Sequence, residues 1–402
     1  GGVDRRQRAE NRNHLMIPYG RQDITQEDID GVLKVLTSDF LTQGPRVPAF
    51  ESALASHIGA PHAVAVNSAT SALHIACLAL GLGAGDRLWT SPITFVASAN
   101  AGLYCGAKVD FVDIDAETFN MCPKALAAKL EAAERDGTLP KIVVPVDMCG
   151  QSCDMVAIRK LADKYGFKII EDASHAIGGR YQGAFVGAHG LADITVFSFH
   201  PVKIITTAEG GMAVTNDADL ARKMGYFRSH GVTREADLME GDSDGPWYYQ
   251  QIDLGYNYRM TEMQAALGVT QMHRLDTYVA ARAARADGYD AALAGLALDL
   301  PGRVPGASSA WHLYVIRLLD AAQRRPVFEA LRAAGIGVNV HYIPVHLQPH
   351  YRRMGFNPGD FPVAEDYYSR AISIPLYATM SDAQQGEVIA AIRAVMTSGV
   401  PA

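Results

Sequence analysis

Apolar residues near the start of the chain recur at the three- and four-residue spacing of amphipathic helices. They are Ile29, Val32, Leu33 and Leu36 in one group, and Val47, Phe50, Leu54 and Ile58 in the next. Thr25 and Asp28 stand where a capping box would begin the first helix, and a turn-rich segment over residues 41–45 separates the groups. The pattern predicts a pair of helices at the start of the fold.

From residue 62 the pattern changes to short apolar runs that alternate with helical segments. The runs predict buried strands over residues 62–66, 87–91, 108–114, 141–146, 167–172 and 192–199. Helical periodicity occupies residues 71–80, 95–105, 123–134 and 155–165. Such alternation indicates an α/β fold with a mostly parallel sheet that helices cover on both faces. Ligands in these folds bind beyond the carboxyl ends of the strands, so we expect the functional site there.

The character of the sequence changes again after about residue 271. Residues 272–295 predict a long helix rich in arginine and alanine, and Ser381 and Gln384 form a capping box before a final amphipathic helix. A chain of 402 residues is also too long for one ordinary hydrophobic core. We therefore divide it into a flexible tail (1–15), a large domain (16–270) and a smaller α+β domain (271–402).

Composition restricts the classes of function. Apolar residues make up 49% of the chain and charged residues 20%, which is the balance of a soluble globular protein. The net charge of -7 argues against a nucleic-acid-binding surface, and no apolar run approaches the ~20 residues of a membrane-spanning helix. The 5 cysteines lack the spacing of a zinc site or a disulfide framework, and the polar N-terminus has no signal-peptide pattern. We therefore expect a cytoplasmic protein that binds no metal ion, nucleic acid or membrane.

A lysine follows the last predicted strand of the alternating region. The segment SFHPVK (198–203) ends in Lys203, and TTAEGG (206–211) follows it with small residues and a glycine pair. Lysine is seldom buried in apolar surroundings unless it is paired or functional. Burial lowers the pKa of an amine, and the neutral form can attack an aldehyde. Lys203 could instead extend to solvent, but its small neighbours favour a chemical role.

Polar residues also follow two other predicted strands. Residues 67–71 (NSATS) stand at a helix N-terminus, where hydroxyl groups and backbone amides can bind a phosphate or simply cap the helix. Asp172 ends the strand over 167–172, where a carboxylate can pair with the ring nitrogen of a pyridoxal cofactor, cap a helix or lie at the surface. His175 could reach the same ligand or be a buried structural histidine.

A later loop combines an amide and a guanidinium with aromatic residues. Asn257 and Arg259 alternate with tyrosines just before a predicted helix over residues 261–267. The planar fork of an arginine can donate two hydrogen bonds to a diphosphate. The alternative is a surface loop with one structural arginine.

Several motifs together resemble those of a known family. They are NSATSALH (67–74), SPITFVASAN (91–100), EDASHAIG (171–178), SFHPVKIITTAEGG (198–211), LGYNYRMTEMQAALG (254–268), HYIPVHLQPHY (341–351) and AEDYYSRAISIPLY (364–377). In this order they resemble the DegT/DnrJ/EryC1/StrS sugar aminotransferases, from about Ile17 to the C-terminus. The resemblance implies the α/β fold of fold type I pyridoxal-phosphate enzymes, with pyridoxal 5'-phosphate as cofactor.

The resemblance also implies roles for residues around that cofactor. Lys203 matches the lysine that bonds the cofactor aldehyde, and Asp172 matches the partner of its ring nitrogen. Phe95 matches the aromatic residue that stacks on the ring, and His175 stands near the ring hydroxyl where many relatives have glutamine. The residues that match the phosphate cradle are Thr70, Ser71 and Ser198.

For the substrate side, the resemblance implies a nucleotide-linked keto-sugar, L-glutamate as amino donor, and a homodimer with shared active sites. Asn257 matches an asparagine that reaches the cofactor phosphate from the other subunit. Arg259, His341 and Tyr342 lie in substrate-side motifs. FLTQGP (40–45) and FRSHG (227–231) are most similar to members of the pseudaminic-acid pathway.

Those members aminate C4 of a UDP-linked 4-keto-6-deoxy-N-acetylhexosamine. Other readings remain: an aminotransferase for a GDP- or dTDP-linked 4-keto-sugar, or a non-catalytic binding protein of the same fold. Related 3-dehydrases carry histidine at the position of Lys203, so this lysine favours transamination.

Overall fold

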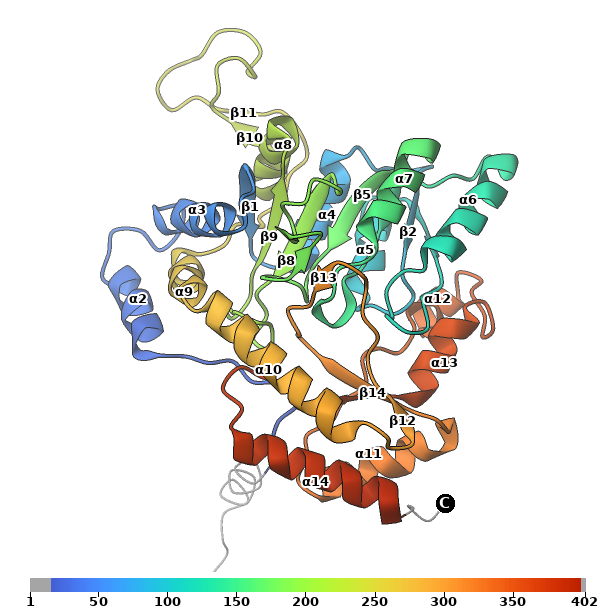
Figure 1. Ribbon diagram of the computed structural model, residues 1–402. Coiled ribbons are helices and arrows are strands. Elements are labelled where there is room, and N and C mark those ends of the chain that lie inside the picture. Colours follow the sequence, from blue (N-terminus) through green and yellow to red (C-terminus); the bar gives the residue numbers. More distant parts are fainter. Residues whose placement is uncertain (1–15, 399–402) are drawn as a thin grey trace, which may run out of the picture.

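The computed structural model describes residues 16–398, and its central element is a seven-stranded sheet (Figure 1). The order across the sheet is β1-β9-β8-β5-β4-β2-β3. Pairing is parallel from β8 to β3, whereas β9 runs antiparallel to both β8 and β1, so the predicted mostly parallel sheet is confirmed. The strands are β1 (His62–Val66), β2 (Arg87–Thr90), β3 (Lys108–Phe111), β4 (Ile142–Val144), β5 (Lys168–Asp172), β8 (Ile194–Ser198) and β9 (Gly211–Thr215).

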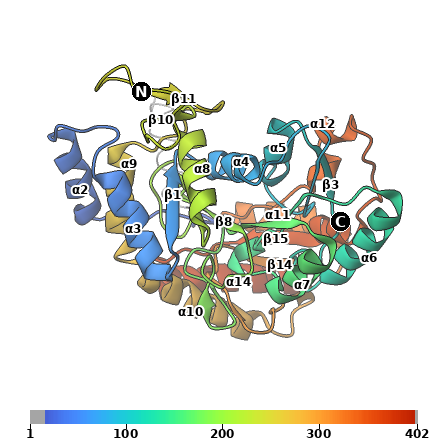
Figure 2. The ribbon, with the colours of Figure 1, turned by 90° about the horizontal axis from the view of Figure 1, so that it is seen from above.

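Helices cover both faces of this sheet, as the alternating pattern predicted (Figure 2). Val64 and Val66 pack into the core beneath α4, α5 and α8, whereas Ala65 between them packs into the core beneath α3, α9 and α10. α6 and α7 cover the rest of that second face. The helices are α3 (Arg46–Ile58), α4 (Ala69–Ala79), α5 (Ala97–Tyr104), α6 (Pro123–Asp136), α7 (Met155–Tyr165), α8 (Ala218–Arg228), α9 (Glu262–Met272) and α10 (Leu275–Leu293).

The C-terminal part forms a core of its own around an antiparallel sheet ordered β12-β14-β15. Ile17, from the other end of the chain, is buried in the same core and forms a bridge with Ile336. The proposed boundary near residue 271 stays a prediction, and residues 1–15 lie outside the described residues. The elements are β12 (Leu298–Asp299), β14 (Tyr314–Leu318), β15 (Ala371–Ile374), α11 (Arg324–Ala333), α12 (Pro349–Arg352), α13 (Pro362–Arg370) and α14 (Asp382–Ser398).

Within the described residues, two further small sheets lie outside the seven-stranded sheet and the β12-β14-β15 sheet. β10 (Val232–Thr233) and β11 (Gln250–Gln251) form a hairpin whose long loop projects from the body of the protein (Figure 1). β6 (Arg180–Tyr181) pairs with β7 (Ala184–Phe185) and with β13 (Ala307–Ser308). The last pairing attaches a C-terminal segment to the region after β5.

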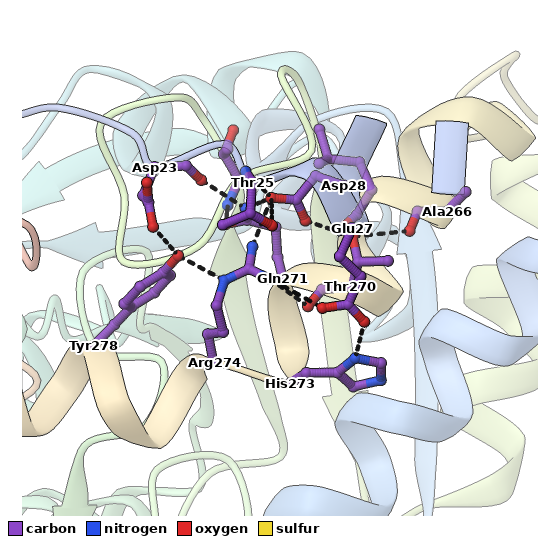
Figure 3. A network of polar contacts seen from close by, with 12 residues as sticks. Asp23, Thr25, Glu27, Asp28, Ala266, Thr270, Gln271, His273, Arg274 and Tyr278 are labelled. Atoms are coloured by element: carbon purple, nitrogen blue, oxygen red, sulfur yellow. Dashed lines mark hydrogen bonds and ion pairs between the residues drawn. The ribbon is translucent and has the colours of Figure 1, made fainter. Parts of the chain in front are cut away.

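Helix α2 (Gln26–Leu36) is fixed to the junction of α9 and α10 by one buried carboxylate (Figure 3). Asp28 accepts hydrogen bonds from Thr270 Oγ1 (2.6 Å), Arg274 Nη2 (2.6 Å), Gln271 Nε2 (3.0 Å) and the Thr25 amide (2.8 Å). The bond from Thr25 belongs to the capping box that the sequence predicted.

The buried face of α2 differs from the prediction, because Asp28 and Val35 are its buried residues. Three of the predicted apolar positions are more than two-fifths exposed: Ile29, Leu33 and Leu36. An apolar helix face is therefore left open on the surface of the single chain.

Three features of the described residues bear on function classes. No helix within residues 16–398 is both long and apolar enough to cross a membrane. Within the same range, no group of three or more histidine, cysteine or acidic side chains is placed to hold a metal ion. The cysteines at positions 77, 105, 122, 149 and 153 are free thiols.

Candidate active site

A cavity of about 500 Å³ lies at the carboxyl ends of the central strands. Val146 beyond β4, Asp172 at the end of β5 and Ser198 at the end of β8 form part of its wall. The cavity brings together most of the predicted site residues: Thr70, Phe95, Asp172, His175, Ser198, Lys203, His341 and Tyr342. Sequence-distant motifs therefore meet at one place, as the position of strand ends predicted.

Lys203 lies in the segment between β8 and β9 and lines this cavity. Its amine forms no hydrogen bond or ion pair with residues 16–398, although the amide of Lys203 bonds to the carbonyl of His200 (2.9 Å). Burial lowers the pKa of the Lys203 amine to about 8, against the opposing charge of Asp172. At pH 7 roughly a tenth of such an amine is neutral, far more than for a lysine in water.

The carboxylate of Asp172 is held by two hydroxyl groups. Ser98 Oγ donates to Oδ2 (2.6 Å), and Ser174 Oγ donates to Oδ1 (2.5 Å). Thr94 Oγ1 lies 2.7 Å from Ser98 Oγ and extends the chain of hydroxyls. Neither serine was predicted from the sequence as a site residue. Ser174 could have been suspected, because a serine two residues after an aspartate commonly bonds to it in a turn, whereas nothing in the sequence connects Ser98 to Asp172.

The N-terminus of α4 faces the cavity and offers donors for an anion. Ser68 caps this helix and accepts from the Ser71 amide (3.1 Å), and Thr70 lines the cavity. The Ser71 hydroxyl donates to Asn67 Oδ1 (2.6 Å), so the structure places Ser71 in the capping network and not on the cavity wall. Amides in a first helical turn have no carbonyl partner within the helix and favour an anion there.

His175 is buried in the wall of the cavity, close to two other rings. Its Nε2 lies 3.2 Å from the Tyr342 hydroxyl, and the ring centroid of His312 lies 4.3 Å from its own. Burial, and after it the charges of Lys203 and His341, lower the pKa of His175 well below its usual value. The imidazole is therefore neutral at physiological pH.

Phe95, Tyr19 and His341 also line the cavity, and the exposed Phe95 lies at its mouth. The Phe95 side chain is 60% exposed, which leaves a phenyl face free to cover a planar ligand or a protein partner. Tyr19, which the sequence analysis did not select, packs on His341 with a centroid distance of 5.4 Å. Burial, followed by the charge of Lys203, lowers the pKa of His341 to about 4.

Two predicted site residues lie away from the cavity of their own chain. Asn257 is exposed in the segment that bridges to Ser229. Arg259 lines a separate hollow of about 250 Å³ beside Arg228, and its buried Nε has no hydrogen-bond partner among residues 16–398. Neither residue is part of the wall of the cavity that contains Lys203.

Comparison with known proteins explains the combination of a lysine, a carboxylate and a helix N-terminus. Residues 22–393 match the profile of the DegT/DnrJ/EryC1/StrS aminotransferase family. The chain belongs to this family. It is accordingly an aminotransferase whose cofactor is pyridoxal 5'-phosphate, and the recognition made from the sequence motifs is confirmed.

Relatives in this family match nearly the whole chain. The spore coat polysaccharide biosynthesis protein SpsC of Bacillus subtilis (strain 168) is 41% identical over 398 residues, which cover 96% of this chain and 99% of the relative. A Campylobacter jejuni protein (serotype O:23/36, strain 81-176) named UDP-4-amino-4,6-dideoxy-N-acetyl-beta-L-altrosamine transaminase is 39% identical over 371 residues, covering 91% and 94%.

A solved structure confirms the predicted fold class. Helicobacter pylori PseC, described as an aminotransferase involved in the biosynthesis of pseudoaminic acid, superimposes with a TM-score of 0.87 at 33% identity. The match covers 96% of this chain and 100% of PseC.

The residues of the family member fit pyridoxal phosphate. The α4 N-terminus suits the phosphate, and the Asp172 carboxylate suits a protonated ring nitrogen. The wall between them is closely fitted, because a Cβ on Gly210 would lie 2.1 Å from Thr207 Oγ1 and one on Gly211 would lie 2.4 Å from the Ala69 amide nitrogen. When bound, the cofactor supplies a ring that withdraws electrons from the reacting carbon.

Proposed function

We propose that this protein transfers an amino group to C4 of a nucleotide-linked 4-keto-6-deoxy sugar, with Lys203 as the catalytic residue. The observation that carries the proposal is the Lys203 amine, with its pKa lowered to about 8, in one cavity with the serine-held carboxylate of Asp172. An amine of this kind is neutral often enough at pH 7 to act as a base and, once protonated, as an acid.

The residues that match the cofactor site of the family then have defined tasks. Lys203 takes the proton from the α-carbon of the amino donor and later delivers a proton to C4 of the sugar. Asp172 keeps its negative charge against the ring nitrogen, and its two serine partners prevent its carboxylate from turning away. Thr70 and Ser198 hold the phosphate from the wall, and Phe95 covers the ring from the cavity mouth.

For the substrate, we propose UDP-2-acetamido-2,6-dideoxy-beta-L-arabino-hex-4-ulose, with L-glutamate as amino donor. The product would be UDP-4-amino-4,6-dideoxy-N-acetyl-beta-L-altrosamine, the compound in the name of the Campylobacter relative. The likeness to PseC, with its role in pseudoaminic acid biosynthesis, supports the same choice. His341 and Tyr342, on the C-terminal side of the cavity, are the proposed contacts to the sugar.

A second candidate is an aminotransferase for another nucleotide-linked 4-keto-sugar, with a GDP or dTDP carrier. It is favoured by the 41% identity to SpsC, which is named for the biosynthesis of a spore coat polysaccharide. Pocket contacts that distinguish such sugars contribute only ~1–3 kcal/mol each, so close relatives can differ in substrate.

A substrate panel tests both candidates. UDP-, GDP- and dTDP-linked 4-keto-sugars are offered separately to the holoenzyme with L-glutamate, and mass spectrometry follows the amino-sugar product. We expect amination of the UDP-linked sugar and none by the Lys203→Ala variant. Product from the GDP or dTDP sugar alone would establish the second candidate, and full turnover by Lys203→Ala would refute the proposed chemistry.

We further propose that the protein acts as a homodimer with shared active sites, in the cytoplasm. Asn257 and Arg259 lie outside the cavity of their own chain, and an exposed Phe95 marks the mouth of that cavity. Burying the open apolar face of α2 against a second copy would remove it from water. The free thiols support a reducing compartment.

A further inference from the structure

His312 is a cavity residue for which the proposed function has no role. It lies in the segment between β13 and β14, is only 4% exposed, and lines the cavity of Lys203. Its Nδ1 is buried without a hydrogen-bond partner among residues 16–398. A buried imidazole with an unused nitrogen, facing a ligand cavity, is a feature that packing alone does not explain.

The backbone around His312 is held in an unusual conformation. Trp311 has a φ of +54°, and the segment opposite it contains Cys149 with a φ of +64°. The amide of His312 bonds to the carbonyl of Cys149 (2.9 Å), and a Cβ on Gly150 would lie 2.9 Å from the same His312 nitrogen. Non-glycine residues adopt such angles only where their surroundings enforce them, and these places are frequently functional.

A buried arginine supplies part of that enforcement. Arg282 in α10 is 1% exposed, and its Nη1 donates to the carbonyls of Trp311 (3.2 Å), His312 (3.3 Å) and Leu376 (3.0 Å). It forms no ion pair within the described part of the chain, and burial lowers its pKa to about 10. Burying a cation that is bonded only to carbonyl oxygens destabilises the folded protein. The position of Arg282 against residues 311–312 therefore indicates a specific task.

The ring of His312 lies next to that of His175. The ring centroid of His175 lies 4.3 Å from that of His312, in a tilted arrangement, and 6.1 Å from that of Tyr342, with an interplanar angle of 26°. The Tyr342 hydroxyl fixes the His175 Nε2 at 3.2 Å. The Nδ1 of each histidine is buried without a hydrogen-bond partner among residues 16–398. Contact with the ring of His312 therefore restrains the His175 ring in addition to the bond at its Nε2.

We propose that His312 is a positioning residue, whose ring, fixed by Arg282 and by the segment at Cys149, holds the imidazole of His175 in the orientation that meets the cofactor ring. The inference rests on the proposed place of the cofactor ring beside His175. Both imidazoles stay uncharged, because burial and the neighbouring ionisable groups His175, Lys203, Arg282 and His341 lower the pKa of His312 well below its usual value, and burial likewise lowers that of His175.

The test uses two variants that separate the ring from its surroundings. His312→Phe keeps an aromatic ring against His175, whereas His312→Leu keeps similar volume without one. His346→Phe, a buried histidine outside the cavity, is the matched control for loss of a core imidazole. Arg282→Lys supplies a fourth variant that leaves the ring of His312 unchanged.

The first readout is independent of activity and of the cofactor. Histidine-labelled apoprotein is followed by NMR between pH 6 and 8, with the His175 resonance assigned from His175→Gln. We expect that resonance to be independent of pH in the native protein and in His312→Phe. In His312→Leu it should move, broaden and titrate, and Arg282→Lys should give a smaller change.

The second readout is the absorbance of the bound cofactor against pH in the holoenzyme. Its apparent midpoint should move by about one pH unit in His312→Leu and stay in place in His312→Phe and in the control. An unchanged His175 resonance in both His312→Leu and Arg282→Lys would overturn the positioning role. A different outcome is that the His175 resonance changes but the cofactor midpoint does not, and that His175→Gln leaves the midpoint unchanged as well. That outcome would show that His175 does not meet the cofactor ring.

Discussion

Asp172 and Lys203 line the same cavity but differ in how their side chains are hydrogen-bonded. The carboxylate of Asp172 has each oxygen engaged by a serine hydroxyl, whereas the amine of Lys203 forms no hydrogen bond within the described residues. Fixing the acid and leaving the amine free suits their proposed tasks, since one must stay charged in place and the other must move and exchange protons.

The lowered pKa of Lys203 predicts how fast the apoenzyme bonds pyridoxal phosphate at different pH values. Only the neutral amine attacks the aldehyde, so the rate should rise with pH and level off above a midpoint near 8. Stopped-flow absorbance measures this rate, with a lysine model compound, midpoint about 10.4, as the reference. A midpoint close to that of the model compound would mean that the Lys203 amine is solvated.

At the scale of single elements, the buried carboxylate of Asp28 gives α2 its position. Asp28→Asn replaces an acceptor of five hydrogen bonds and removes the charge that faces Arg274 (2.6 Å). Loss of one partner of such a pair costs about 3 kcal/mol. Urea denaturation at pH 7 should show a loss of that order, and Asp30→Asn, on the exposed part of the same helix, should change little.

The same pair gives a dependence on pH with a definite sign. Burial alone would raise the pKa of Asp28, but the bonds from Arg274, Thr25 and Thr270 outweigh it and the pKa is lowered. The stabilisation is then present above the unfolded value of about 3.9 and is lost as the pH falls through the folded value. The difference between the native protein and Asp28→Asn should therefore shrink below pH ~4, and a constant difference would contradict the assignment.

Elements with strong periodicity were predictable from the sequence, and those that depend on distant partners were not. The strands β1 and β5 have their predicted positions to within one residue, because each is a short apolar run between polar turns. β9 was missed, since its apolar run directly follows the glycine pair at 210–211 and pairs antiparallel with β8 and with the sequence-distant β1. The helices predicted over 261–267 and 272–295 correspond to α9 and α10, although α9 extends to Met272 and α10 begins only at Leu275.

The residues of the site likewise divide into those that the sequence predicted and those that it did not. Lys203 and Asp172 were found because strand ends are the expected place for chemistry in a parallel sheet. Ser98 lies in a helix far from Asp172 in sequence, and His312 follows a segment with no clear period. Their approach depends on tertiary packing, which no local pattern reports.

In the whole molecule, neither Asn257 nor Arg259 lines the active-site cavity of its own chain. A shared site predicts that two inactive variants restore each other. A heterodimer of Lys203→Ala and Asn257→Ala, purified with two different tags, contains one intact site and should have about half the activity of the native dimer.

The matched control is a heterodimer of Lys203→Ala and Asp172→Ala. Both residues line the cavity of their own chain, so neither of its sites is intact and no activity should return. An inactive heterodimer with Asn257→Ala, or full activity in the Asn257→Ala homodimer, would place Asn257 outside the partner's site.

The antiparallel pairing of β8 with β9 limits how the loop between them, which carries Lys203, can move. Both ends of the loop that carries Lys203 are tied at Phe199, whose amide bonds to the Gly210 carbonyl (3.0 Å) and whose carbonyl accepts from the Thr207 amide (3.0 Å). These two bonds restrain the backbone of the loop, so the Lys203 amine moves mainly by rotation about the carbon–carbon bonds of its own side chain. Because the amine then acts from a fixed side of the cavity, the handedness of an amino-sugar product would depend on which face of its carbon the pocket turns toward Lys203.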